Sequence, residues 1–238
     1  MTTQHSELPD NSLALVQRHS LTSLVAQAVE KMILSGQALP GTKLNEAAIA
    51  ESLGVSRGPL REAFRTLEES GLIRQEKNRG AWVREIEVSE AAAIYEVRAG
   101  LEAMAGRLLV ERRDEPQTAG RITTLRRLID DMATVAESGD ADRYHALNLA
   151  FHDQLIAATG NPTLQAVYGR LVKQLALFRR RNLANRTVLP QSLAEHAAIV
   201  ERIVAGDAHG TAEALINHAR GSMQRMLAQA NNPPPEHS

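Results

Sequence analysis

The chain has 238 residues and a formal net charge of −1, so it is long enough for two domains and has no overall positive field to hold nucleic acid. It contains no cysteine, which excludes disulfides and thiolate metal sites, and aromatic residues make up only 3% of it, so any core must be aliphatic. No early apolar stretch has signal-peptide character and none is long enough to span a bilayer, which favours a cytoplasmic protein without a membrane partner.

The first predicted element is a helix at Ser20–Ser35, which Gly36 ends. Its apolar residues recur three and four positions apart, which predicts an amphipathic helix that packs under the elements that follow. These residues are Leu21, Leu24, Val25, Ala28, Val29, Met32 and Ile33. The residues before it, Met1 to Asn11, are polar, and we expect them to be disordered.

A shorter helix is predicted at Asn45–Ser52, with Asn45 as its N-cap. Its apolar face is formed by Ala48, Ile49 and Leu53. Gly54 follows at once, where a glycine in the left-handed conformation ends a helix. The pattern therefore predicts a short helix that leads into a tight turn.

Ser56 can cap the next helix, and Pro59 is tolerated in its first turn because the amide that it lacks would have no partner there. The buried stripe of this helix is formed by Leu60, Ala63 and Leu67, and an adjacent exposed stripe by Arg57, Arg61 and Arg65. A short helix, a glycine turn and a second helix with arginines in its early turns are typical of a motif that inserts into a DNA major groove. The alternative is a solvated helix face, because Glu62, Glu68 and Glu69 share the helix.

Two short strands are predicted at Leu72–Glu76 and Ala81–Glu85, on either side of a turn at residues 78–80. Trp82 is the only tryptophan, and we expect it to pack against the body of the domain rather than to stack on a ligand. From Arg57 to Arg84 there are seven basic and four acidic residues, and this local positive excess has the sign that phosphate contact requires. Its modest size predicts a DNA site that is read by two copies of the chain.

Past Ile86 the pattern is helical throughout, with glycine and proline between the segments. The predicted helices are Ala91–Arg112, which Ser89 caps, Pro116–Glu137, Asp142–Thr159, Thr163–Asn182, Gln191–Ala205 and Asp207–Ala230. Six helices with short connections predict an antiparallel bundle. The expected fold is mainly α, with a DNA-binding domain at residues 12–86 and a helical domain at residues 87–231. The tail from Asn231 contains three prolines and cannot continue the last helix. We expect Arg179–Arg181 to form a solvated helix end.

Histidines on three of these helices form a second candidate site. Asn148 and His152 project from one face of one helix, while His196 and His218 lie on the last two helices. Imidazole nitrogens and an amide oxygen from facing helices can converge on a divalent metal. The alternative is that scattered histidines are exposed or singly hydrogen-bonded, and we give His145 no ligand role.

The N-terminal segments PGTKL, LGVSRGPLREAFRTLEESGLI and NRGAWV resemble, in order and spacing, the DNA-binding domain of the GntR family of bacterial transcription regulators. The resemblance implies a winged helix-turn-helix. It implies that Ser56, Arg57 and Arg61, with Arg65 beside them, contact phosphates and base edges, and that Asn78, Arg79 and Gly80 form the tip of the wing. Ala47 is a departure, because some relatives have an arginine there that adds a contact.

The segments EVRAGLE, NLAFHDQL, SLAEHAAIVERIVAGD and INHAR resemble the FCD effector domain of the FadR subfamily of these regulators, and six helices point to its VanR-like branch. The resemblance implies that Asn148, His152, His196 and His218 hold a divalent metal ion, zinc or similar, which helps to bind a small carboxylate effector. Asn148 is a neutral ligand in place of an aspartate, so metal affinity should be lower. Arg98 matches an arginine that pairs with the effector carboxylate, although a structural ion pair with Glu102 is the alternative.

The function that we expect is a ligand-responsive transcription regulator, a repressor rather than an enzyme. A homodimer would place two recognition helices in successive major grooves of a palindromic double-stranded DNA operator, and a small organic acid would release it. Two alternatives stay open. One is an architectural DNA-binding protein without an effector. The other is a metal-dependent hydrolase, for which the sequence offers neither a general base nor an HExxH motif.

Overall fold

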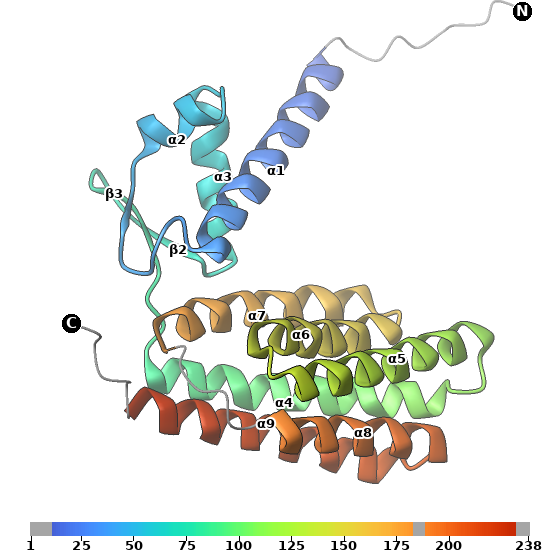
Figure 1. The fold of residues 1–238 in the computed structure, drawn as a ribbon. Coiled ribbons are helices and arrows are strands. Elements are labelled where there is room, and N and C mark those ends of the chain that lie inside the picture. The colour runs from blue at the N-terminus through green and yellow to red at the C-terminus, as the bar shows by residue number, and fades with distance from the viewer. Residues whose placement is uncertain (1–10, 183–188, 232–238) are drawn as a thin grey trace, which may run out of the picture. The chain divides into compact units, whose positions relative to one another are not determined.

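The computed structural model describes residues 11–182 and 189–231, and the chain divides into two units between Glu85 and Ile86 (Figure 1). Three of our predictions lie outside the described structure. They concern the residues before Asn11, the tail after Asn231 and the side chains of Arg179–Arg181. No helix within the described ranges combines the length and the apolar character that a membrane span requires.

The first unit is built on helix α1 (Asn11–Ser35), which packs against α3 (Arg57–Glu69). Helix α1 begins before the predicted Ser20, and Gly36 follows it with a φ of +82°. Its contact face is formed by Val25, Ala26, Val29 and Ile33, whereas Leu21 and Leu24 are exposed. The predicted apolar face was therefore too wide, because a single partner helix covers only one stripe of α1.

Helix α2 (Glu46–Ser52) is capped as predicted, since the Asn45 side chain accepts hydrogen bonds from the amides of Ala47 and Ala48. Its apolar face was predicted correctly at Ile49, which is buried, but wrongly at Ala48 and Leu53, which are exposed; Ala50 is buried instead. A helix of only 7 residues does not show enough turns for its buried face to be read from the sequence.

The buried and exposed faces of helix α3 are as predicted. Leu60, Ala63 and Leu67 are buried together with Phe64, and the three arginines of the neighbouring stripe are exposed. Gly54 has the expected left-handed conformation, with a φ of +64°. Ser56 occupies the N-cap position with extended backbone, but its hydroxyl makes no capping hydrogen bond.

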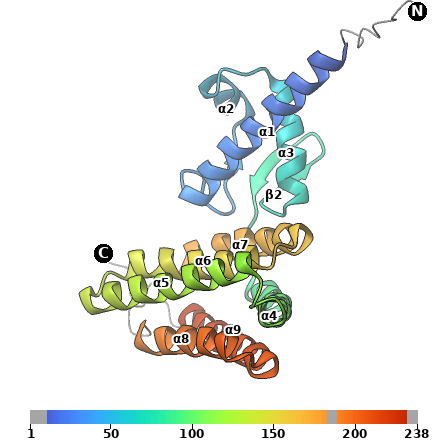
Figure 2. The ribbon, with the colours of Figure 1, turned by 90° about the vertical axis from the view of Figure 1, so that its right-hand side faces the viewer.

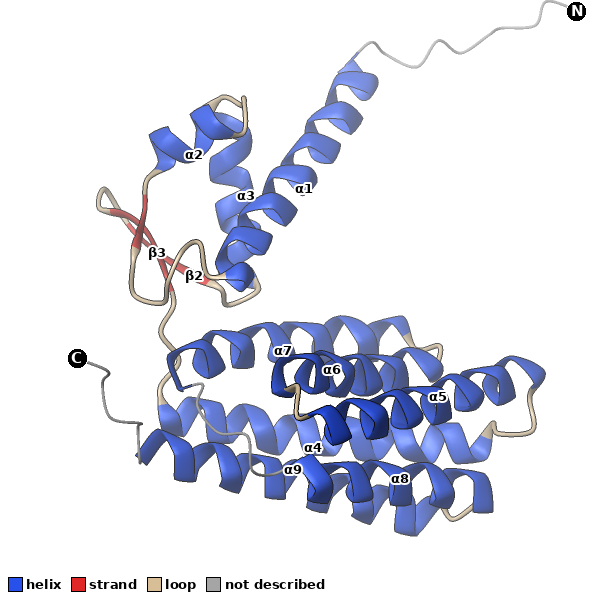
Figure 3. Cartoon of the chain, viewed as in Figure 1, coloured by secondary structure: helices blue, strands red, loops and turns tan. Residues whose placement is uncertain are grey.

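A small antiparallel sheet completes the first unit, in the order β1 (Lys43–Leu44), β3 (Gly80–Val83), β2 (Ile73–Glu76) (Figure 3). Strand β1 was not predicted, because two residues carry no alternating pattern. The prediction for Trp82 was wrong. Its two neighbours on β3 are buried, whereas the Trp82 ring lies between the cations of Lys43 and Arg74, whose Nζ and Cζ are 5.3 and 5.1 Å from its centroid.

The second unit is a bundle of six described helices, as predicted (Figure 2). They are α4 (Val88–Glu111), α5 (Pro116–Ser138), α6 (Ala141–Ala158), α7 (Pro162–Asn182), α8 (Leu189–Ala205) and α9 (Ala208–Asn231). Ser89 is not the N-cap that we expected. Helix α4 begins at Val88, and Glu87 holds the N-cap position. The core is aliphatic, with a few aromatic rings such as Phe151 and Tyr168.

Helices α4 and α9 approach each other closely at Gly106. A Cβ atom at this position would lie 2.6 Å from Leu215 Cδ1 and 2.7 Å from Thr211 Cγ2. A larger residue here would therefore force the side chains of Leu215 and Thr211 to shift. The same two helices carry Glu102 and His218, which belong to the buried site described below.

Candidate functional site

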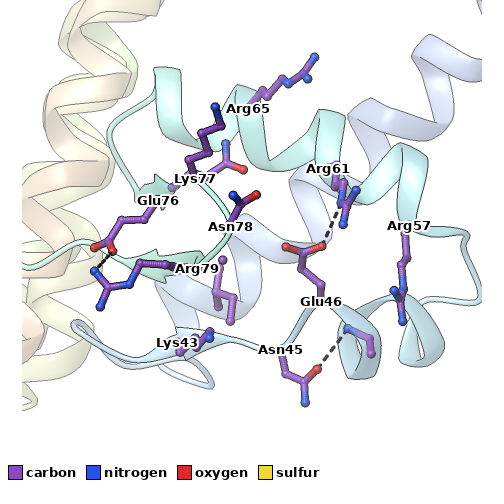
Figure 4. A pocket seen from close by; sticks show the side chains of 14 residues that line it. Lys43, Asn45, Glu46, Arg57, Arg61, Arg65, Glu76, Lys77, Asn78 and Arg79 are labelled. Atoms are coloured by element: carbon purple, nitrogen blue, oxygen red, sulfur yellow. Dashed lines mark hydrogen bonds and ion pairs between the residues drawn. The ribbon is translucent and has the colours of Figure 1, made fainter.

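The first unit contains a groove of about 990 Å³ between α2, α3, β1 and the turn that joins β2 to β3 (Figure 4). Six basic side chains line it, against the two acidic side chains of Glu46 and Glu76; the basic ones are Lys43, Arg57, Arg61, Arg65, Lys77 and Arg79. We call this surface the basic groove. Asn78 and Gly80 also line it, so the structure brings together every predicted DNA-contacting residue except Ser56, which is exposed outside the lining.

The three arginines of α3 have different partners in the basic groove. Arg61 Nε donates to Glu46 Oε2 at 3.1 Å, and Arg65 Nη1 donates to Glu62 at 3.0 Å. Arg57 has neither an ion pair nor a side-chain hydrogen bond within the described part of the chain. Because exposed ion pairs within one helix add little stability, Arg65 can exchange Glu62 for phosphate at low cost.

The turn between β2 and β3 has a shape that depends on two residues. Asn78 has a φ of +62° and is the only non-glycine residue in the described ranges with a positive φ. Gly80 has a φ of +110°, and a Cβ atom there would lie 3.1 Å from Lys43 Cε. Asparagine tolerates the left-handed region and glycine adopts it freely, so this turn projects Lys77 and Arg79 beside α3.

Sequence reasoning missed Lys43 and Glu46 as residues of the basic groove. Lys43 lies within the PGTKL segment, but its place in the groove follows from the pairing of β1 with β3 opposite Trp82. Glu46 is the first residue of α2, and only the packing of α2 against α3 shows that it contacts Arg61.

The second unit contains a buried cluster of His152, His196 and His218, which come from α6, α8 and α9; we call it the histidine cluster. The Nε2 atom of His152 lies 3.2 Å from the Nε2 atoms of both other histidines. One nitrogen from each ring lies within 4.8 Å of the other two, so these atoms could hold a metal ion. His145 is not part of this group.

The remaining ring nitrogen of each histidine faces an acceptor. His218 Nδ1 lies 2.6 Å from Glu195 Oε2, and His196 Nδ1 lies 2.6 Å from the Ser192 carbonyl oxygen. His152 Nδ1 lies 3.1 Å from Glu102 Oε1 without forming a hydrogen bond to it, and it has no other hydrogen-bond partner in the described structure. The acceptors at His196 and His218 favour the tautomer with the proton on Nδ1, which leaves the Nε2 lone pair of each of these two rings free to bind a metal.

His152 and His196 are uncharged near neutral pH. Burial lowers the pKa of His152 to about 4, against the raising effect of Glu102. Burial likewise holds the pKa of His196 well below its usual value. Converging lone pairs on neutral rings repel one another, and a cation between them would remove that repulsion.

Asn148 lies one turn before His152 on α6, and its Oδ1 is buried with no hydrogen-bond partner in the described structure. An unpartnered buried acceptor is costly, so this oxygen is a candidate for a further ligand atom. Glu102 Oε2 is unpartnered in the same way. The donor set of imidazole nitrogens and an amide oxygen suits zinc and similar divalent ions.

Arg98 forms the structural ion pair that we gave as the alternative to effector contact. It is buried, and its Nε donates to Glu102 Oε1 at 2.6 Å. Tyr168 donates its hydroxyl hydrogen to the same oxygen at 2.7 Å. Burial alone would raise the pKa of Glu102, but Arg98 and then His152 hold it well below its usual value, so Glu102 is a carboxylate.

Two family models match the chain. The model of the bacterial regulatory proteins of the gntR family matches residues 21–83, and the FCD domain model matches residues 93–221. The chain belongs to the GntR family. It is a transcription regulator with an N-terminal DNA-binding domain and a C-terminal FCD effector domain, and not an enzyme.

Other GntR regulators resemble it over most of their length. The HTH-type transcriptional regulator YdhC of Bacillus subtilis is 29% identical over 176 residues, which are 74% of this chain and 77% of that protein. The galactonate operon transcriptional repressor of Escherichia coli is 25% identical over 226 residues, which are 86% and 96% of the two chains. The solved structure of E. coli McbR/YncC has the same fold, with a TM-score of 0.72 at 23% identity over 89% of this chain and 99% of that one.

Proposed function

We propose that this protein is a metal-dependent repressor that binds a palindromic operator as a homodimer and releases it when a small organic acid enters the FCD domain. The observation that carries the proposal is the convergence of three buried Nε2 atoms, with that of His152 3.2 Å from each of the other two, in a domain joined to a basic groove. The proposal thus assigns a sensor site and a DNA-reading site to one chain.

On DNA, α3 is the proposed recognition helix in the major groove. Arg57, Arg61 and Arg65 would contact phosphates and base edges, with Ser56 donating to a phosphate at the start of the helix. The turn of Asn78, Arg79 and Gly80 would contact the adjacent backbone. The basic groove has an excess of four positive charges, which is small for tight binding and supports a site read by two copies.

In the FCD domain, we propose that His152, His196 and His218, together with Asn148, hold a divalent ion, zinc or similar. Imidazole and amide ligands carry no negative charge, so the bound ion would keep its positive charge within the ligand set and attract a carboxylate. Arg98, held through Glu102 beside His152, is the proposed second cation for that carboxylate. Among the relatives are repressors named after the galactonate and gluconate operons, and both compounds are hydroxy carboxylates.

The exposed face of α4 supports the homodimer. Figure 2 shows α4 end on at the edge of the bundle, beside α7 and α9. Val97 and Met104 on this face are 53% and 45% exposed, and Gly100 between them has open space above its backbone. In an antiparallel pairing of two α4 helices, Met104 would lie over the partner's Gly100. Glu96 would then face the partner's Arg107, and neither charge has a partner in the described chain.

Met104→Glu is expected to dissociate the dimer, because the pairing would bury two carboxylates against apolar surface. Sedimentation equilibrium should give the mass of a dimer for the wild type and that of a monomer for this variant. Val204→Glu is the matched control, since Val204 is 42% exposed on α8. A dimer that survives the change at Met104 would argue against this face as the interface.

Operator binding in the presence of candidate effectors tests the whole proposal. The zinc-loaded protein is titrated at fixed salt with a duplex from upstream of its own gene and with a random duplex, with and without gluconate, galactonate and citrate. We expect at least one carboxylate to weaken operator binding about tenfold or more, as expected for a coupling of 1–3 kcal/mol, and to lose this effect after chelation. Specific binding that no carboxylate alters would support the architectural alternative.

A further inference from the structure

Glu46 places a negative charge in a groove that has to accept DNA phosphates. It begins α2 and lines the basic groove, where its Oε2 accepts a hydrogen bond from Arg61 Nε at 3.1 Å (Figure 4). Its side chain is 26% exposed, while that of Arg61 is 64% exposed. A carboxylate here repels phosphate, so its presence at this position opposes binding to DNA of any sequence.

The three arginines of α3 differ in how they are held. Arg57 has no side-chain partner in the described chain, and Arg65 is bound through Nη1, which contacts both Glu62 oxygens at 3.0 and 3.3 Å. Arg61 is bound through Nε, so the edge formed by its two Nη groups stays available. That edge is the fork that pairs bidentately with O6 and N7 of guanine.

We propose that Glu46 is a positioning residue for sequence recognition: it holds Arg61 by its Nε side, presents the guanidinium fork to a guanine and keeps Arg61 from pairing with phosphate. The inference rests on the proposed operator binding and assigns base reading to Arg61 and phosphate contact to Arg57. Glu46 thereby lowers affinity for random DNA and raises affinity for the operator. Specificity is the ratio of the two affinities, so both effects increase it.

Glu46 has a simpler role that must be separated from this one. An acidic residue in the first turn of α2 interacts favourably with the helix dipole. That role affects thermal stability, but it does not distinguish one DNA sequence from another. The test therefore needs a readout of sequence discrimination and of salt dependence beside the melting temperature.

Glu46→Gln is the informative variant, because it removes the charge and keeps the shape. We expect the ratio of operator to random-duplex affinity to fall about tenfold or more, the loss expected when a base contact is no longer oriented. Binding to random DNA should gain about one unit of salt slope, since Arg61 is free to neutralise another phosphate. Glu51→Gln makes the same charge change at an exposed position of α2 outside the groove, and should leave the ratio unchanged.

A double-mutant cycle with Arg61→Ala decides whether Glu46 acts through Arg61. In the Arg61→Ala background, Glu46→Gln should change the ratio no further. If the ratio falls equally in both backgrounds, or stays at the wild-type value whatever the melting temperature, the positioning role is wrong. A wild-type protein that does not discriminate between the two duplexes would instead overturn the proposed operator binding.

Discussion

Replacing Arg61 with alanine is expected to weaken operator binding about 100-fold or more at fixed salt. A bidentate contact with a base is worth about 1–3 kcal/mol, and a dimer loses it in both half-sites. Affinity for random DNA should change much less, because Arg61 is held by Glu46 rather than directed at phosphate. Fluorescence anisotropy titrations with the operator and with a random duplex measure both quantities.

Arg126→Ala is the matched control for this prediction. Arg126 is exposed on α5 of the FCD domain and has no ion pair in the described ranges. It should bind the operator as the wild type does, and both variants should respond to zinc identically. Operator affinity that is equal for Arg61→Ala and Arg126→Ala would count against α3 as the recognition helix.

Zinc is expected to raise the melting temperature of the metal-free protein by about 10 °C when its free concentration is about a thousand times the dissociation constant of the zinc complex. That excess stabilises the folded state by about 4 kcal/mol, and each kcal/mol shifts the midpoint by about 2–4 °C for a domain of this size. His196→Ala should abolish most of the shift, since it removes one of the three converging Nε2 atoms. Differential scanning fluorimetry after chelation and readdition of zinc measures it.

His209→Ala controls for zinc binding to histidines in general. His209 lies on α9 and its side chain is 81% exposed; within the described ranges its one ion pair is with Glu213, at 3.7 Å. This variant should keep the full zinc response. If the His196→Ala variant kept the zinc-dependent rise in melting temperature and the His209→Ala variant lost it, the proposed metal site would be wrong.

Much of the fold could be predicted because long helices repeat their pattern. The bundle helices span 17–24 residues, so their apolar stripes recur over several turns, and glycine or proline separates most of them. The predictions that were wrong concern short or one-sided elements. Strand β1 has 2 residues, and the buried face of α2 depends on the angle at which it meets α3. Trp82 was misplaced because its alternation with buried neighbours puts it on the outer face of the sheet.

For the two candidate sites, the sequence predicted the residues better than it predicted their contacts. The stripe of Arg57, Arg61 and Arg65 follows from helical periodicity alone, whereas the pairing of Arg61 with Glu46 depends on the contact between α3 and α2. The sequence put His152, His196 and His218 on three helices, but it could not show that they converge. Nor could it identify Glu195 and the Ser192 carbonyl, whose contacts with the outer ring nitrogens depend on side-chain rotamers.

The tight fit at Gly106 limits which parts of the FCD domain can move. Because α4 and α9 pack closely around Gly106, we expect them to move together as one body. This body carries Glu102 on one helix and His218 on the other. Any rearrangement that an effector causes must then be taken up by α6 and α8, which supply the other two histidines.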